Sequence, residues 1–169
     1  MNWPYLHTLI NHFPIILTVV GAAALASALI WRKRGAWLYA LATLTLAGLA
    51  AYPAFLTGDE AADVMRRRWY VVRSMIESHE ESADLALWVL LVMGAVSAYG
   101  WWRMTRREPG SLPPRWVRLV VLFATLASLG AVTYTAWLGG RIVHDSPRLL
   151  QVPPGFDTTT PPRSGTPTR

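Results

Sequence analysis

Four long stretches of the chain contain no Lys, Arg, Asp or Glu, and short charged segments separate them. These stretches are residues 4–31, 35–58, 85–102 and 119–140. Roughly 20 apolar residues in a helix cross the hydrocarbon core of a bilayer. In lipid, only helices or closed barrels satisfy every backbone polar group. The pattern therefore predicts an all-α, polytopic membrane protein whose four transmembrane helices form an up-down bundle.

We expect the helices at about residues 4–31, 36–56, 80–103 and 115–141, within a transmembrane domain of residues 1–146. The connection between the second and third helices is the longest. Five of its apolar side chains recur at helical spacing: Val64, Met65, Trp69, Val72 and Ile76. This spacing predicts an amphipathic helix lying in the membrane interface. Ser78 and Glu81 have the spacing of a capping box, which predicts that the third helix starts there.

The charged residues give an orientation. The net charge is +6, and we interpret it as a membrane-topology signal, with no nucleic-acid partner expected. Basic side chains crowd the helix ends at the two short connections, after the first and third helices, which favours the cytoplasmic side for them. Both termini are then expected on the outer, periplasmic side. Residues 147–169 are rich in Pro and Thr, so we expect an extended tail without a core of its own.

The composition excludes several kinds of site. The chain has no cysteine, which excludes disulfides, thiolate metal sites, iron–sulfur ligation and haem attached through thioethers. The sequence also shows no nucleophile with a base, no phosphate-binding loop and no carboxylate-rich metal cage. We therefore do not expect a stand-alone enzyme.

All four histidines fall at one end of the predicted bundle. His7 and His12 lie at the head of the first helix, His79 begins the third, and His144 follows the fourth. The first and third helices are diagonal in a simple bundle. With neighbouring helices about 8–10 Å apart, that diagonal is about 12–14 Å, which suits a planar macrocycle between two imidazoles.

This arrangement predicts one haem b with His12 and His79 as its axial ligands. His12 is preferred because it lies deepest in an apolar stretch, where an ionisable residue indicates function. His7 and His144 are the second choice, either as the alternative pair or as ligands of a second haem at another depth. The protein would carry electrons between a quinone pool and an extracytoplasmic redox partner, together with other subunits of a membrane complex.

Two other interpretations of the histidines stay open. Imidazoles also suit copper or zinc. Alternatively, the chain is a cofactor-free structural subunit of a respiratory or photosynthetic complex, with the tail as a strap. Interfacial histidines would then meet only lipid headgroups and water.

Three short motifs resemble a known family. His12-Phe13-Pro14-Ile15, with a histidine five residues earlier, resembles the H-P-x-x-V-H-F-P-I opening of the bacterial membrane family catalogued as domain of unknown function 2231. Thr57-Gly58 resembles that family's T-G motif, and residues 139–144, which read G-G-R-I-V-H, resemble its closing segment. Thr8 departs from the family's first proline, and residues 145–147 depart from its ending. The resemblance covers residues 6–146 and implies a protein of the bacterial inner membrane that works beside cytochrome c or Rieske-type proteins.

Overall fold

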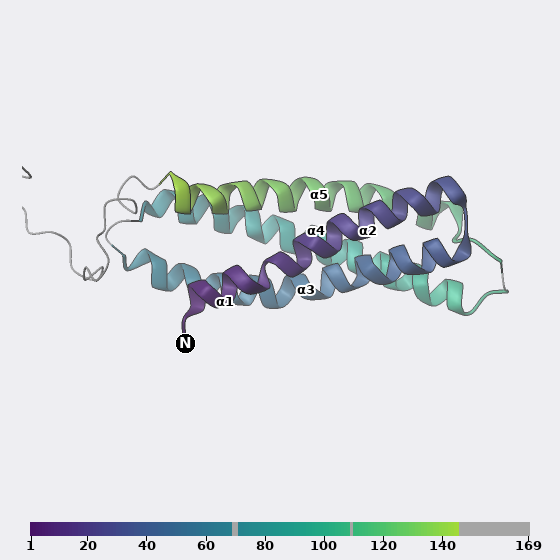
Figure 1. Ribbon diagram of the computed structural model, residues 1–169, viewed down its shortest axis with the longest axis horizontal. Coiled ribbons are helices and arrows are strands. Elements are labelled where there is room, and N and C mark those ends of the chain that lie inside the picture. Colours follow the sequence, from purple (N-terminus) through teal and green to yellow (C-terminus); the bar gives the residue numbers. More distant parts are fainter. Residues whose placement is uncertain (69–70, 109, 146–169) are drawn as a thin grey trace, which may run out of the picture.

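The computed structural model describes residues 1–68, 71–108 and 110–145, and these residues form five helices and no strand (Figure 1). The helices are α1 (Trp3–Ile10), α2 (His12–Trp31), α3 (Arg34–Arg66), α4 (Arg73–Thr105) and α5 (Arg115–His144). Residues 147–169, where we expect an extended tail, lie outside the described part of the chain.

Four helical stretches are long and apolar enough to cross a membrane. The first combines α1 and α2, and the others are α3, α4 and α5. The prediction of an all-helical protein with four membrane-length apolar helices is therefore confirmed. Because Pro14 has no N–H to give to the carbonyl of Ile10, the first stretch is interrupted near Asn11, between α1 and α2.

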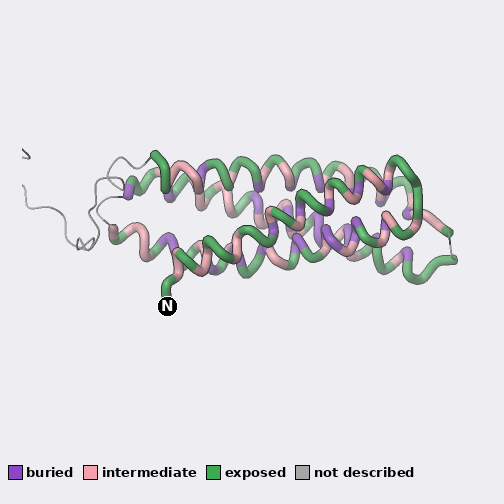
Figure 2. Tube along the Cα trace, viewed as in Figure 1, coloured by how far each residue is buried: buried purple, intermediate pink, exposed green. Residues whose placement is uncertain are grey.

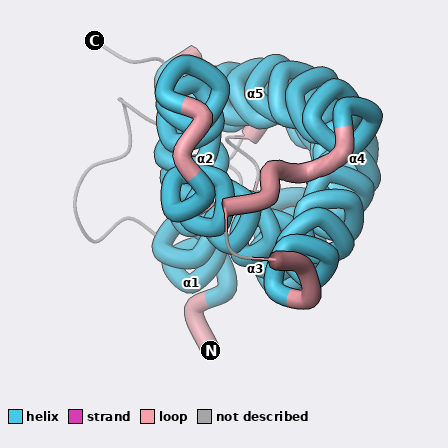
Figure 3. Tube along the Cα trace, turned by 90° about the vertical axis from the view of Figure 1, so that its right-hand side faces the viewer, coloured by secondary structure: helices cyan, strands magenta, loops and turns pink. Residues whose placement is uncertain are grey.

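The four long helices surround a common axis when the molecule is viewed end-on (Figure 3). α3 lies between α2 and α4, and α5 lies between α4 and α2, while α1 packs mainly on α3. The backbones of α3 and α4 approach each other closely at Gly48 and Gly94. A Cβ on Gly48 would lie 2.7 Å from the carbonyl oxygen of Leu90, so only glycine allows this contact.

The core follows one face of each helix (Figure 2). In α2 the buried positions are Pro14, Thr18, Gly21, Leu25 and Ala28, which alternate spacings of four and three residues as a helix face requires. The side chains that meet them from the other helices are mostly aliphatic. They include Leu41 and Leu44 of α3, Leu90 and Met93 of α4, and Val117 and Val121 of α5.

The long second connection differs from the prediction. α3 continues past Pro53 to Arg66 and α4 already begins at Arg73, so the structure does not show a separate interfacial helix. Trp69 lies outside the described residues. The apolar side chains in this region extend the bundle instead. Ala62, Val71 and Ile76 are buried together, with Met65 and Ile142 packed against them. The capping-box start at Ser78 is not used, because α4 begins at Arg73, about one and a half turns earlier, and buries Ile76 in those turns.

At the opposite end of the bundle, Arg34 joins two connections. Its guanidinium donates hydrogen bonds to the carbonyl oxygen of Met104 and to Ser111. The start of α3 is thereby tied to the segment between α4 and α5.

Candidate functional site: a pair of histidines

His7 of α1 and His79 of α4 face each other at one end of the bundle. Their ring centres are 6.4 Å apart, and the ring planes make an angle of 75°. Both side chains are partly buried. The helices that carry them pack on different neighbours: α1 mainly on α3, and α4 on α3 and α5. The two imidazoles therefore approach from different helices that have few contacts with each other.

The ring of His7 rests on one turn of α3. Its Nδ1 lies 3.1 Å from the carbonyl oxygen of Ala54 and 3.4 Å from the hydroxyl of Thr57. Gly58 lies directly under the ring, because a Cβ there would be 3.0 Å from Cε1 of His7. A larger residue at position 58 would push the imidazole away from α3.

The ring of His79 rests on α5 in the same way. Its Nδ1 lies 3.0 Å from the carbonyl oxygen of Thr135. A Cβ on Gly139 would be 3.1 Å from Cε1 of His79. A second contact strengthens this junction, because the hydroxyls of Ser82 and Thr135 lie 2.6 Å apart and that of Thr135 also reaches the carbonyl oxygen of Ser82.

The two histidines are thus held by the same local arrangement. In each case the accepting carbonyl belongs to a residue four positions before a glycine: Ala54 before Gly58, and Thr135 before Gly139. In an α-helix, the side chain of a residue covers the turn that precedes it. Glycine leaves that turn bare, so the carbonyl oxygen can accept a second hydrogen bond from an imidazole.

These contacts fix the form of both imidazoles. A carbonyl oxygen only accepts, so Nδ1 of each ring carries the proton and Nε2 is the nitrogen with a free lone pair. Metal-binding histidines commonly have this arrangement, because the hydrogen bond at one nitrogen sets the tautomer and orientation of the other. In each imidazole of the pair, Nε2 is therefore the nitrogen that could bind a metal.

His12 does not join the pair. Five residues turn a helix by about 140° beyond one full turn, so His12 lies on the opposite face from His7. Its Nδ1 reaches back to the carbonyl oxygen of Thr8. The side chain is exposed and lines a shallow outer groove with Tyr5 and Phe13. His144, the other second-choice ligand, is exposed at the last residue of α5. The structure thus brings together one first-choice and one second-choice histidine, His79 and His7.

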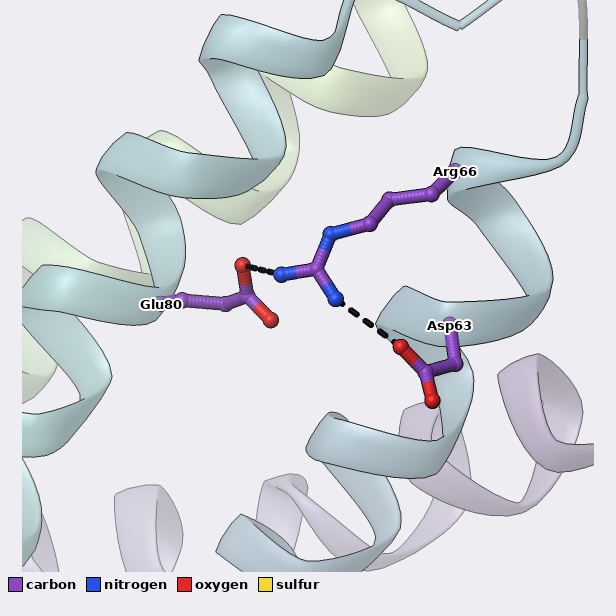
Figure 4. Close-up of polar contacts among 3 residues, drawn as sticks. All are labelled: Asp63, Arg66 and Glu80. Carbon is purple, nitrogen blue, oxygen red and sulfur yellow. Dashed lines mark hydrogen bonds and ion pairs between the residues drawn. The ribbon is translucent and has the colours of Figure 1, made fainter.

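An apolar cluster and an ion-pair cluster lie beside the histidines, where α3 ends and α4 begins. The apolar cluster is the group of Ala62, Val71 and Ile76. Ile76 lies three residues before His79 on α4. In the ion-pair cluster, Arg66 binds Asp63 at 2.9 Å and also Glu80, the residue after His79 (Figure 4). Arg66 therefore joins the last turn of α3 to the turn of α4 that carries a histidine.

Sequence reasoning missed the supporting residues. Ala54, Ser82 and Thr135 carry no signal of their own, since their roles depend on which helices touch. The glycines did carry one: the Thr57-Gly58 and Gly139-Gly140 motifs stand out in the sequence, and each supplies the glycine under a histidine. The common spacing, an acceptor four residues before a glycine, is visible only once the contacts are known.

The chemistry of the donor set limits which group the pair can hold. Within the described part of the chain, no three His, Cys, Asp or Glu side chains gather in a way that could hold a metal ion. Structural zinc almost always has four protein ligands, and catalytic zinc three. Two opposed imidazoles instead suit a cofactor that brings its own equatorial ligands.

Comparison of the chain with models of known protein families, with curated proteins and with solved structures finds no match. The resemblance to domain of unknown function 2231 stays a prediction.

Proposed function

We propose that this chain is a multi-pass membrane protein that binds one haem b, with His7 and His79 as the axial ligands. The observation that carries the proposal is the opposed pair of imidazoles, each with Nδ1 on a backbone carbonyl and each resting on a glycine. Of the two ligands that the sequence favoured, His79 is retained and His12 is replaced by His7.

The spacing of the rings supports an iron between them. An imidazole nitrogen binds a metal at about 2.0–2.1 Å and lies roughly 1 Å from the centre of its ring, which puts two axial ring centres about 6 Å apart. The observed separation of 6.4 Å agrees with that value.

Haem would supply a one-electron redox centre and the four equatorial nitrogens that the described residues do not offer. The chain supplies the rest. The carbonyls of Ala54 and Thr135 hold the two imidazoles in their ligating form, and Gly58 and Gly139 let the rings sit close to α3 and α5. The apolar cluster around Ile76 packs at the nearby end of the bundle, where it would limit the access of water to a bound haem.

The position of the pair supports a role in electron transfer at a membrane surface. The charge-free part of α3 ends at Gly58, and that of α4 begins at Leu85, so His79 lies about 9 Å beyond it at 1.5 Å per residue. We place this end on the periplasmic side of a bacterial inner membrane, with the helices crossing in alternating directions. The protein would pass electrons between membrane quinone and a partner such as a cytochrome c or Rieske-type protein, within a larger complex.

A second candidate function has one observation in its favour. Aromatic rings in direct edge-to-face contact have centres about 4.5–7 Å apart, so the two imidazoles also fit a plain packing contact at 6.4 Å. The chain would then be a cofactor-free scaffold subunit of a membrane complex.

A reduced-minus-oxidised visible spectrum of the purified protein separates the two functions. We expect a b-type band in the wild-type protein, loss of the six-coordinate band in His7→Ala and in His79→Ala, and an unchanged band in His12→Ala. The His12 variant is the matched control, because this side chain, at the first residue of α2, is exposed and lines the outer groove. A folded wild-type protein without haem after expression with ample haem supply would refute the cytochrome function and favour the scaffold.

A further inference from the structure

We propose that His7 is a displaceable ligand, so that the protein binds a small uncharged diatomic molecule, such as carbon monoxide, at the iron position that His7 vacates. This inference rests on the proposed haem site. It assigns unequal roles to the two histidines: His79 anchors the cofactor, and His7 closes or opens the opposite coordination position.

The first observation is how little holds α1 in place. α1 has 8 residues, and none of them is buried. It packs mainly on a single helix, α3. His79, in contrast, belongs to the 33-residue helix α4, which is buried at positions on both sides of the histidine, including Ile76 and Ala86. Movement of His7 needs only a short segment without buried residues to move, whereas movement of His79 would disturb the core.

The second observation is the interruption between α1 and α2. Pro14 cannot donate the backbone hydrogen bond that would join it to Ile10, and α1 ends at that residue. Pro14 itself is buried and belongs to the packed face of α2. Helices commonly kink where proline removes a hydrogen bond, so the turn around Asn11 is the point at which α1 would bend relative to α2, although Asn11 itself keeps its backbone hydrogen bond to His7.

The third observation is the unequal support of the two rings. The carbonyl that holds His79 belongs to Thr135, whose hydroxyl is itself bonded to Ser82 of α4. This clamp joins α4 and α5 within one turn of His79. On the other side, the hydroxyl of Thr57 donates to carbonyls of its own helix, at Pro53 and Ala54, and it meets α1 at the ring of His7 itself, 3.4 Å from Nδ1. The junction of α1 and α3 is thus held through the ring that would move, whereas the junction of α4 and α5 is also held beside the ring of His79.

The weaker support of His7 favours a ligand that binds only when His7 has left the iron. Its apparent affinity equals its intrinsic affinity multiplied by the fraction of molecules in which His7 is off the iron. A substitution that weakens the contacts between His7 and α3 should raise that fraction. A substitution that weakens the contacts between His79 and α5 to the same extent should not.

The glycines under the two rings give a matched test with carbon monoxide. Gly58→Ala places a methyl group 3.0 Å from His7, and Gly139→Ala places one 3.1 Å from His79. For the dithionite-reduced proteins, we expect Gly58→Ala to bind carbon monoxide about tenfold faster than wild type, which corresponds to about 1.4 kcal/mol. We expect Gly139→Ala to raise this rate less than Gly58→Ala does and to weaken haem retention instead, because His79 holds the cofactor and the Ser82–Thr135 hydrogen bonds join α4 to α5 beside it. The readout is the carbon monoxide difference spectrum.

Three further variants guard against misfolding. Pro14→Ala restores the backbone N–H at position 14, so carbon monoxide should bind more slowly than in wild type. His7→Gly should keep its haem and bind the gas fully, whereas His79→Gly should lose its haem. The proposal is overturned if Gly139→Ala accelerates binding as much as Gly58→Ala, or if neither Gly58→Ala nor Pro14→Ala changes the rate. Absence of haem in the wild-type protein would instead refute the proposed function, and a b-type spectrum with symmetric behaviour would refute only this inference.

Discussion

Thr135 has two roles at the histidine pair, and they can be separated. Its backbone carbonyl accepts a hydrogen bond from His79, and its side-chain hydroxyl lies 2.6 Å from that of Ser82. Valine has nearly the same shape and keeps the carbonyl, but it lacks the hydroxyl. The substitution therefore tests whether the position of the carbonyl depends on the clamp between α4 and α5.

We expect Thr135→Val to bind haem about tenfold more weakly, because residues that orient a metal ligand typically contribute a factor of 10–100 to metal affinity. The rate of haem transfer to an excess of a haem-free acceptor protein measures the effect. Thr133→Val is the control, since that threonine is exposed on the outer face of α5. Equal transfer rates for the two variants would show that the clamp does not support His79.

The choice between His7 and His12 shows what the sequence could and could not predict about the site. The meeting of a histidine from the first apolar stretch with His79 follows from the order of the helices. Which histidine of the first stretch faces inward depends on helix rotation, and a stretch that is apolar on all sides gives no such signal. Depth favoured His12. The buried series Pro14, Thr18 and Gly21 instead continues backwards, in steps of three and four, through Asn11 to His7.

At the scale of elements, the junction of α3 and α4 depends on two glycines. Gly48→Ala would place a methyl group 2.7 Å from the carbonyl oxygen of Leu90 and 2.8 Å from Cα of Gly94. Both of these are backbone atoms, so a helix has to move. We expect a loss of about 1–3 kcal/mol in the free energy of unfolding, the usual effect of overpacking.

Gly130→Ala is the matched control for this prediction, because a Cβ there meets nothing within 4 Å. Alanine has the higher helix propensity, by about 0.8–1.0 kcal/mol, so this variant should be as stable as wild type or slightly more so. Unfolding of both variants in detergent, followed by circular dichroism, provides the comparison. If Gly48→Ala unfolds with wild-type stability, the two helices are not in tight contact at this point.

In the connection between α3 and α4, the apolar spacing correctly indicates helix but does not indicate where that helix packs. Val64, Met65 and Ile76 do have helical spacing, as the sequence indicated. The same spacing serves a helix lying on a membrane and a helix end that packs on its neighbours. In the structure, burial of Ile76 against Ala62 and the ion pair between Arg66 and Glu80 favour continuous helices. The sequence does not contain these long-range contacts in readable form.

At the scale of the whole molecule, the number of membrane-length helices was predictable because it depends on composition alone. Their sidedness is a separate question, and the charges at the two ends of the bundle give the prediction. One end has Lys33 and Arg107 in short connections close to the apolar helices. The other end has the histidine pair, with Glu60 and Arg73 exposed nearby. Basic residues in short loops are retained in the cytoplasm, so the histidine pair should face the periplasm.

The absence of cysteine makes this sidedness directly testable, because a single introduced thiol is the only site for a maleimide. In intact bacterial cells, a membrane-impermeant maleimide should label Glu60→Cys and Arg73→Cys. It should label Lys33→Cys and Arg107→Cys only after the membrane is permeabilised, and the unmodified chain never. The reverse pattern would put the histidine pair on the cytoplasmic side, and exchange with a periplasmic cytochrome would then be impossible. Labelling of Glu60→Cys and Arg73→Cys from opposite sides would contradict the alternating path of the helices, because these two positions flank the same connection.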